Sequence, residues 1–425
     1  MDLQTKLKEN FPLYLQIVQD LIRLDTQCIG HGIEGGKEKA GQDFIADLMR
    51  KWGADEVLID PMSEDVIQKA IAEYGEGNPN HGYEDRFNVY GTFKGKRSDQ
   101  APSILFNGHM DTMPPGDLDL WTHSPWDPVV SDGKLYGRGA ADMKVGLLAP
   151  LFALHLLHAC GLEPDGDVKI ISVADEEGGG NGSIQAAMNG VRADAAVVCE
   201  GTDDELILAH MGFVFFEITC RGLAIHAGNK FLGVSAIEKM LRLVNELHEV
   251  EHSWLAHYKH PLLPAPSINI GEIYGGTAGS TVADLCTIKT CVHYLPEIMN
   301  RAFVENEIRA AMKRVEAGDA WLTDHPFEAH VYQSGGSYEM DPQHDLSQAF
   351  RKAYAASRGK EVNIVGSPGG CDSRVWRNIA QIPTLQFGPG RLAQCHTIDE
   401  YVELEQFEQS ILIYANLIRN WCSEK

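Results

Sequence analysis

Residues 103–111 have the sequence SILFNGHMD, in which an apolar run ends in a histidine and an aspartate. A short apolar run of this kind is typical of a buried strand in a parallel sheet. Two similar runs, 168–174 and 195–199, alternate with helical patterns that begin at Met143 and Ser183. Strands that alternate with helices predict an α/β fold class, with a mixed, mostly parallel sheet and helices on both of its faces.

The pattern changes between residues 206 and 328. Strand-like and helix-like segments there follow the order βαββαβ, which is typical of a small sheet with two helices on one face. The chain then returns to an α/β pattern and ends in a helix at 404–421. We therefore expect a discontinuous catalytic domain, 1–205 and 329–425, with an α+β, ferredoxin-like domain inserted at 206–328.

The charge of the chain excludes two classes of partner. Thirty-six basic and 60 acidic side chains give a formal charge of −24, which repels phosphate backbones and anionic lipid headgroups. Neither nucleic acid nor a membrane is therefore an expected partner. The most apolar stretch, 145–160, is shorter than the roughly 20 residues of a membrane span, so we expect a buried helix there.

Two further observations concern the cellular compartment. Residues 1–25 carry acidic residues among apolar ones at helical spacing, which predicts an amphipathic helix and not a signal peptide. The nine cysteines form no C-x-x-C pair, and their number is odd. Both features favour reduced thiols in the cytoplasm.

Polar side chains follow each of the three apolar runs. His109 and Asp111 follow the first, the sequence DEE at 175–177 follows the second, and Glu200 follows the third. Ligands of α/β proteins bind at the carboxyl ends of parallel strands, so these side chains are candidates for one site. Taken singly, His109 could be a solvated histidine at a strand end, and 175–177 a solvated acidic loop.

Two glycine-rich segments add further candidates. Residues 137–144, GRGAADMK, resemble a nucleotide-binding loop but lack its third glycine, so a dinucleotide site is not expected. Asp142 in this segment could by itself be the N-cap of a helix. His396 follows the turn 388–390. Two imidazoles with several carboxylates at strand ends are the donor set expected for a pair of zinc ions.

Together these segments resemble the M20 family of dinuclear metallohydrolases in order and spacing. Members of that family include acetylornithine deacetylase, succinyl-diaminopimelate desuccinylase, aminoacylase-1 and glutamate-releasing carboxypeptidases. The resemblance covers nearly the whole chain, including the inserted domain. The matching motifs are His109-x-Asp111, Gly137-Arg138-Gly139-x-x-Asp142-x-Lys144, Asp175-Glu176-Glu177, Glu200 and His396.

The resemblance implies a hydrolase with two divalent metal ions per subunit, with zinc expected and cobalt or manganese as alternatives. It implies that the bridging ligand joins ions about 3.5 Å apart and is followed by a cis peptide bond, here Asp142-Met143. The metal ligands that it implies are His109, Glu177, Glu200 and His396, with Asp142 as the bridge.

The resemblance also implies three catalytic residues. Glu176 is the implied general base, and Asp111 is the implied partner that orients His109. The inserted domain resembles the family's lid and dimerisation domain, and its segment GLAIHA at 222–227 resembles the motif G-x-x-x-H-[AS]. In the family this histidine, here His226, holds the substrate carbonyl oxygen in the partner's site of a homodimer. The alternative is an ordinary histidine at a strand end.

The lid departs from the family pattern at positions that contact substrate. His293 stands where many relatives have an arginine that binds a substrate carboxylate, and an imidazole cannot replace a bidentate guanidinium. Ser280 stands at the position of an asparagine. Residues 369–374, GGCDSR, resemble the family's substrate loop, with Cys371 in place of threonine. Arg374 in this loop could bind an anion or form a structural salt bridge.

Residues 225–240 and the sequence around His293 are most similar to the acetylornithine-deacetylase-like group. That group includes a deformylase of formylaminopyrimidines, whose substrate has an aromatic ring and no α-carboxylate. We therefore expect an enzyme that hydrolyses the amide of an N-acyl amino acid or N-acyl amine. Such a deformylase and a carboxypeptidase or dipeptidase are the alternatives. A non-catalytic binding protein would have lost the base or a ligand, and none is lost here.

Overall fold

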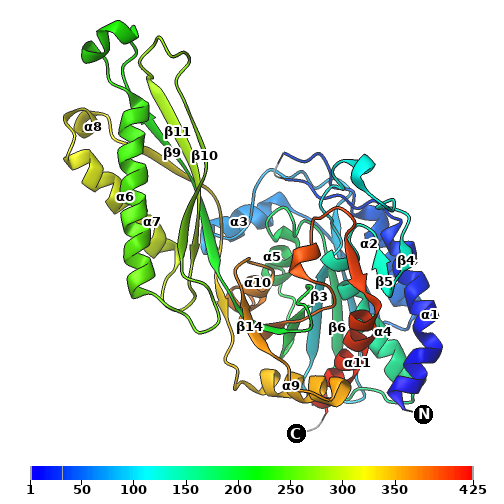
Figure 1. The fold of residues 1–425 in the computed structure, drawn as a ribbon. Coiled ribbons are helices and arrows are strands. Elements are labelled where there is room, and N and C mark those ends of the chain that lie inside the picture. Colours follow the sequence, from blue (N-terminus) through cyan, green and yellow to red (C-terminus); the bar gives the residue numbers. More distant parts are fainter. Residues whose placement is uncertain (1, 31, 99, 424–425) are drawn as a thin grey trace. The chain divides into compact units, whose positions relative to one another are not determined.

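The structure is a computed structural model that describes residues 2–30, 32–98 and 100–423 (Figure 1). The chain forms two compact units. The catalytic unit comprises the chain up to Leu208, Met340–Val365 and the chain from Cys371 onward. The lid unit comprises Ala209–Glu339 and Gly366–Gly370. The sequence predicts the inserted domain at residues 206–328, whereas the lid unit begins at Ala209 and continues to Glu339, since its last strand begins at Glu328 and runs to Gly335.

A nine-stranded sheet has the order β1-β2-β6-β3-β7-β15-β8-β13, and β14 also pairs with β8. Its central strands β6, β3, β7 and β15 run parallel, and the outer pairs are antiparallel. The predicted mixed α/β fold is therefore confirmed. The strands are β1 (Glu56–Pro61), β2 (Phe87–Phe93), β3 (Ile104–His109), β6 (Val168–Val173), β7 (Ala196–Val198), β8 (Leu206–His210), β13 (Tyr338–Glu339), β14 (Ile364–Ser367) and β15 (Thr384–Gln386).

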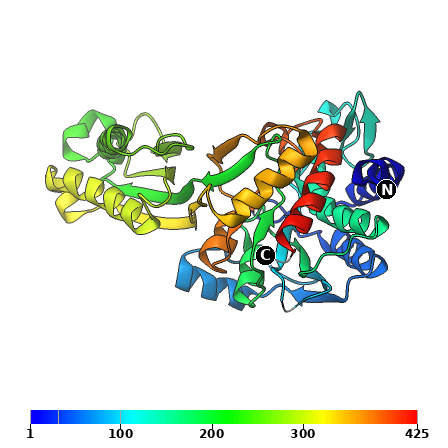
Figure 2. The ribbon, with the colours of Figure 1, turned by 90° about the horizontal axis from the view of Figure 1, so that it is seen from below.

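Helices cover both faces of this sheet. Helices α1, α2, α4, α9 and α11 lie on one face, where α9 and α11 run side by side (orange and red in Figure 2), and α3, α5 and α10 lie on the other. The helices are α1 (Leu3–Ile22), α2 (Lys39–Lys51), α3 (Glu64–Tyr74), α4 (Val145–Ala159), α5 (Asn181–Met188), α9 (Asp345–Arg358), α10 (Ser373–Asn378) and α11 (Leu404–Trp421). A small antiparallel sheet consists of β4 (Val129–Ser131), β5 (Lys134–Tyr136) and β16 (Tyr401–Glu403).

The central helix α4 is apolar on all sides, which requires a position in the core. By length and composition the stretch Ala140–Ala159 could cross a membrane, but 94% of its most apolar window is buried inside the protein. This burial agrees with the buried helix expected from the sequence. Near the start of the chain, α1 is the amphipathic helix that residues 1–25 predict, and its apolar side is buried.

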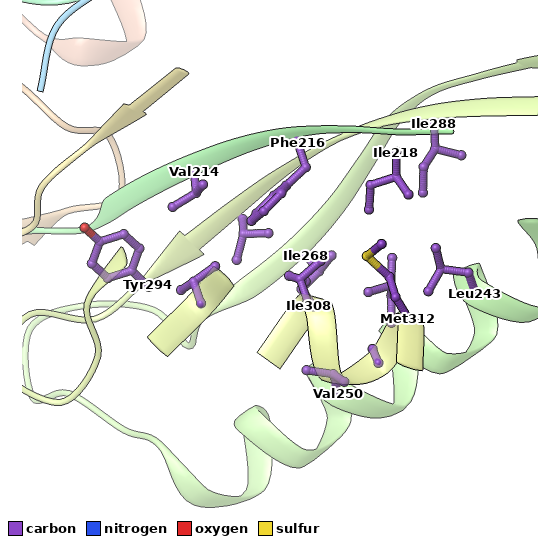
Figure 3. Close-up of a cluster of buried hydrophobic side chains, with 14 of the residues drawn as sticks. Val214, Phe216, Ile218, Leu243, Val250, Ile268, Ile288, Tyr294, Ile308 and Met312 are labelled. Carbon is purple, nitrogen blue, oxygen red and sulfur yellow. The ribbon is translucent and has the colours of Figure 1, made fainter. Parts of the chain in front are cut away.

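The lid unit is the expected ferredoxin-like domain. Its antiparallel sheet has the order β10-β11-β9-β12, and α6 and α7 pack on one face. Side chains of β9 alternate between buried and half-buried, so Val214, Phe216 and Ile218 point together into the core against the two helices (Figure 3). The elements are β9 (Gly212–Arg221), α6 (Ala236–His257), β10 (Ser267–Gly275), β11 (Leu285–Tyr294), α7 (Arg301–Ala317), α8 (Ala320–Asp324) and β12 (Glu328–Gly335).

Candidate metal centre

The parallel centre of the sheet brings the predicted strand-end residues together. Strand β3 pairs with β6 on one side and with β7 on the other, and His109 at the end of β3 lies opposite Val173. The DEE segment follows β6 directly, and Glu200 follows β7. Because these strands run parallel, their carboxyl ends meet at one edge of the sheet, as expected for an α/β site.

Asp142 lies between the two imidazoles. Its Oδ1 is 2.9 Å from Nε2 of His109, and its Oδ2 is 3.2 Å from Nε2 of His396. His109 Nε2 also lies 3.5 Å from Oε1 of Glu200, and His396 Nε2 lies 3.0 Å from Oε2 of Glu177. The five predicted ligands therefore form two groups that share Asp142, with one carboxylate oxygen facing each group.

The charges and donor atoms of this cluster fit a bound cation. Burial raises the pKa of Glu200 well above its usual range, with a contribution from the Asp142 carboxylate. Hydrogen bonds to Asp142 and Glu177 raise the pKa of His396 to about 10. The buried Oε1 of Glu177 has no hydrogen-bond partner among the residues described. Carboxylates brought together out of water are costly unless a metal ion compensates them, so the donor set fits a divalent ion.

Glu176 lies in the same cluster, since one carboxylate oxygen of Glu176 lies within 4.8 Å of ligand atoms of His109 and Glu200. Burial, together with the neighbouring Asp372, raises the pKa of Glu176 well above its usual range. Glu176 thus lies, as the sequence predicts, beside the candidate metal ligands, and a buried carboxyl group with a raised pKa is suited to proton transfer.

The structure corrects the contact expected for Asp111. His109 Nδ1 donates to the main-chain oxygen of Asp111 at 2.8 Å, while the carboxylate lies 3.7 Å away. The carboxylate instead accepts from the main-chain N–H groups of Glu176 and Glu177, at 3.1 and 3.0 Å. Asp111 thus contacts the imidazole through its main chain and holds Glu176 and Glu177 through its side chain.

The structure also reveals a role for Glu400, which the sequence did not indicate. Its carboxylate accepts from the main-chain N–H groups of Ala141 and Asp142, at 2.8 and 3.1 Å. Arg138 of the glycine-rich segment donates to the same carboxylate at 2.6 Å. Glu400 thus fixes the turn that carries Asp142. The guanidinium of Arg138 compensates the negative charge of the Glu400 carboxylate. The peptide bond Asp142-Met143 is cis, as expected.

Arg374 lies fully buried in the catalytic unit. Its Nε donates to Glu76 at 3.0 Å, and its other nitrogens donate to the carbonyl oxygens of Cys371 and Gly179, at 2.7 and 3.0 Å. Of the two roles that the sequence left open, this geometry favours the structural salt bridge over anion binding.

The lid unit brings His226 and Ser280 together and leaves His293 apart from them. The main chains of His226 and Thr281 pair in an isolated antiparallel β-bridge, and Ala227 N–H donates to the Ser280 carbonyl at 2.8 Å. His226 and Ser280 are exposed. His293 lies near the other end of β11, opposite Phe213, and burial lowers its pKa, so the imidazole is neutral.

Comparison with known proteins identifies the family. The sequence model of the peptidase family M20/M25/M40 matches residues 105–420. The chain belongs to this family. The chain is thus a metal-dependent hydrolase of amide bonds, as the sequence motifs implied. An M20-family metallo-carboxypeptidase from Sulfolobus solfataricus has the same fold, with a TM-score of 0.74 at 14% identity over 96% of this chain and 99% of that one.

Two relatives are similar over most of the M20 chain. An N-formyl-4-amino-5-aminomethyl-2-methylpyrimidine deformylase from Halalkalibacterium halodurans is 32% identical over 79% of this chain and 83% of the relative. A probable succinyl-diaminopimelate desuccinylase from Staphylococcus epidermidis is 25% identical over 94% of this chain and 97% of the relative.

Proposed function

We propose that this M20 enzyme hydrolyses the amide of a small N-acyl amine that has no free carboxylate, with a formylated aminomethyl heterocycle as the model substrate. One observation carries the proposal: the buried cations of the catalytic unit are already engaged within the protein. Arg374 binds Glu76, Arg138 binds Glu400, and Lys144 donates to two main-chain carbonyls. Arg86 pairs with Glu38 and Asp175.

The lid supports the same substrate class. A substrate carboxylate needs a cation or a fork of donors, and the family arginine position holds the neutral imidazole of His293. A net charge of −24 also disfavours an anionic substrate. The 32% identity to a deformylase of a formylated aminomethylpyrimidine supports the formyl group and the aromatic amine.

In this proposal His109, Asp142 and Glu200 would hold one divalent ion, and Asp142, His396 and Glu177 the other. When bound, the ions, which we propose are zinc, lower the pKa of a coordinated water and polarise the scissile carbonyl. Asp142 is suited to the shared position because its two oxygens face the two histidines.

Glu176 would accept the proton of the attacking water at its carboxylate and deliver it to the nitrogen of the leaving amine. Burial and the nearby Asp372 support this role, because a raised pKa lets the carboxyl group hold the proton between the two transfers. Asp111 fixes the direction of Glu176 through the main-chain N–H of that residue. The products are a free amine and a short carboxylate.

His226 of the partner subunit would complete the site of a homodimer. Gly228 N–H donates to His226 Nδ1 at 3.1 Å, so Nδ1 is the acceptor of the ring and Nε2 can donate to a substrate carbonyl oxygen. The lid also exposes apolar surface: Phe231 is 81% and Leu232 58% exposed. Such surface on a soluble domain with an edge strand is suited to a twofold contact.

We also propose a cytoplasmic location, since all nine cysteines are unpaired in the structure and several of them are buried.

The substrate class is tested with a matched pair of compounds that differ only by a carboxylate, N-formylbenzylamine and N-formylphenylglycine. N-acetyl and N-succinyl amino acids and dipeptides serve as further substrates, each assayed with the zinc-loaded and cobalt-loaded enzyme. We expect N-formylbenzylamine to have the higher kcat/KM of the pair. Preference for N-formylphenylglycine, for a succinylated amino acid or for a dipeptide would overturn the proposed substrate class.

A further inference from the structure

Residues 76–86, here called the clamp segment, lead from the end of α3 to β2 through a stretch without regular structure. The polar groups of this segment converge on a second segment, the turn at 175–181, which follows β6 and carries Glu176 and Glu177. We call the second segment the base turn. None of the roles given above to the metal ligands or the base uses the clamp segment.

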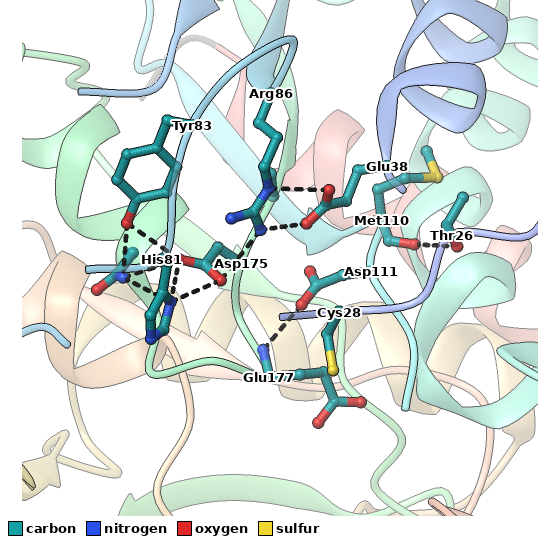
Figure 4. A network of polar contacts seen from close by, with 12 residues as sticks. Thr26, Cys28, Glu38, His81, Tyr83, Arg86, Met110, Asp111, Asp175 and Glu177 are labelled. Carbon is teal, nitrogen blue, oxygen red and sulfur yellow. Dashed lines mark hydrogen bonds and ion pairs between the residues drawn. The ribbon is translucent and has the colours of Figure 1, made fainter. Parts of the chain in front are cut away.

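The main contact is with the carboxylate of Asp175, the first residue of the base turn (Figure 4). His81 Nδ1 lies 2.9 Å from its Oδ2, and the Tyr83 hydroxyl donates to the same oxygen at 3.1 Å. Arg86 Nη2 donates to Oδ1 at 3.1 Å and also pairs with the buried Glu38, which accepts from Arg86 Nε as well. Asp175 is fully buried, and three side chains of one segment thus hold it.

A second set of contacts fixes the rest of the base turn. Asn78 donates from Nδ2 to the Gly178 carbonyl at 3.0 Å and from its main chain to Asn181 Oδ1 at 2.9 Å. There is no room for a side chain at Gly178, since a Cβ atom would lie 2.5 Å from Asp175 Oδ1. Asp175 itself has φ +62°, in the left-handed region that non-glycine residues rarely adopt. The turn therefore has one well-defined conformation.

Stability alone does not explain this network. Two buried carboxylates and a guanidinium lose their hydration, and apolar groups of similar volume often give equal or greater stability. The network instead fixes the orientation of the residues that follow Asp175. Asp175 immediately precedes Glu176 and Glu177, whose main-chain N–H groups donate to the carboxylate of Asp111.

We propose that His81, Tyr83 and Arg86 are positioning residues: by fixing Asp175 they aim the carboxylate of Glu176 and the ligand oxygens of Glu177. This inference rests on the proposed roles of those two glutamates. A displacement of about 1 Å in a reacting group can reduce the rate by about a hundredfold, so loss of one contact to Asp175 should be visible in turnover.

Two matched tyrosine variants test the proposal. Tyr83→Phe removes one hydroxyl that donates to Asp175. The control, Tyr354→Phe, removes another buried hydroxyl, which donates to Asp204 at 2.9 Å. Both variants should lose similar thermal stability. Only Tyr83→Phe should lower kcat, by about tenfold with little change in KM, and alter the visible absorption of the cobalt-loaded enzyme, which reports on the Glu177 ligand.

If loss of the Tyr83 hydroxyl changes turnover too little to measure, two variants of His81 provide a second test. His81→Ala should reproduce the Tyr83→Phe defects more strongly, and His81→Asn, which retains a donor, should restore part of the activity. If Tyr83→Phe and His81→Ala both fold and keep the turnover and cobalt spectrum of the parent enzyme, the network is only structural and the inference is wrong. Glu176→Gln distinguishes this result from failure of the proposed function. If the Glu176→Gln enzyme is active, Glu176 is not the general base, and the proposed function fails rather than the positioning role.

Discussion

The catalytic unit and the lid unit differ in how closely each keeps to its family's pattern. Every metal-ligand position of the catalytic unit holds the expected residue, and the five side chains converge around Asp142. The lid has the expected fold but carries His293 and Ser280 at positions where relatives have arginine and asparagine. In the proposed function, the catalytic unit carries out the reaction and the lid unit adjusts the choice of substrate.

The two units also present their functional groups differently. Asp111, Asp142, His109 and Asp175 are buried and held by several partners each. His226 and Ser280 are exposed and lie on loops. A buried network permits few substitutions because each loss leaves an unpaired polar group, whereas loop residues can change at little cost in stability.

The largest expected effect is loss of the metal centre from the catalytic unit. His109→Ala and His396→Ala each delete a direct ligand, so each protein should bind less than two metal ions per chain and lose nearly all turnover. Metal content is measured by elemental analysis after dialysis, with His293→Ala in the lid as the control that keeps its metal. Unchanged metal content in both ligand variants would contradict the assignment.

Glu176→Gln should separate chemistry from binding within the same unit. The amide keeps the shape of the side chain but cannot accept a proton, so turnover should fall about 10²–10⁴-fold with both metals retained. Steady-state kinetics and metal analysis on one preparation give both quantities. Near-normal turnover with full metal occupancy would exclude Glu176 as the base.

His226→Ala tests whether the lid contributes to catalysis across a dimer. Loss of one donor to a developing oxyanion typically costs about 10²–10³-fold in kcat, and the metals should stay bound. Mixing this variant with Glu176→Gln should restore activity, since one site of the heterodimer then combines an intact Glu176 with an intact His226. If subunit exchange is demonstrated and no activity returns, the shared site is excluded.

The smallest effect is expected from His293→Arg, which restores the residue that many relatives carry in the lid. A guanidinium can bind a carboxylate through two hydrogen bonds, so the preference within the pair N-formylbenzylamine and N-formylphenylglycine should move about tenfold toward the carboxylated compound. The ratio of the two kcat/KM values measures this shift. An unchanged ratio would show that the lid position does not select the substrate.

The sequence predicted well the features that depend on neighbouring residues. Apolar runs located the central strands, and the polar residues after them located the cluster of candidate metal ligands, because strand and cluster are adjacent in the chain. Features that join distant residues were missed. Glu400 pairs with Arg138 across 262 positions, and Arg374 pairs with Glu76 across 298. A pattern along the chain carries no information about which buried charges meet, so these pairs became visible only in the fold.

Asp111 shows a second limit. The family resemblance implied that Asp111 orients His109, and in the structure the Asp111 main chain contacts the imidazole while the carboxylate holds the base turn. Spacing predicts which residues are neighbours but not which atoms of them bond. The end of the lid unit differs because the last expected strand begins at Glu328, where the inserted domain expected from the sequence ended, and runs to Gly335.

The central claim is that Asp142 bridges two metal ions at the edge of the sheet. Anomalous diffraction at the zinc edge from crystals of the zinc-loaded protein tests it directly. The account predicts two anomalous peaks about 3.5 to 4 Å apart, one contacted by His109 and Glu200, the other by His396 and Glu177, with Asp142 bound to both. A single peak at full zinc loading, or two peaks of which only one contacts Asp142, would contradict it.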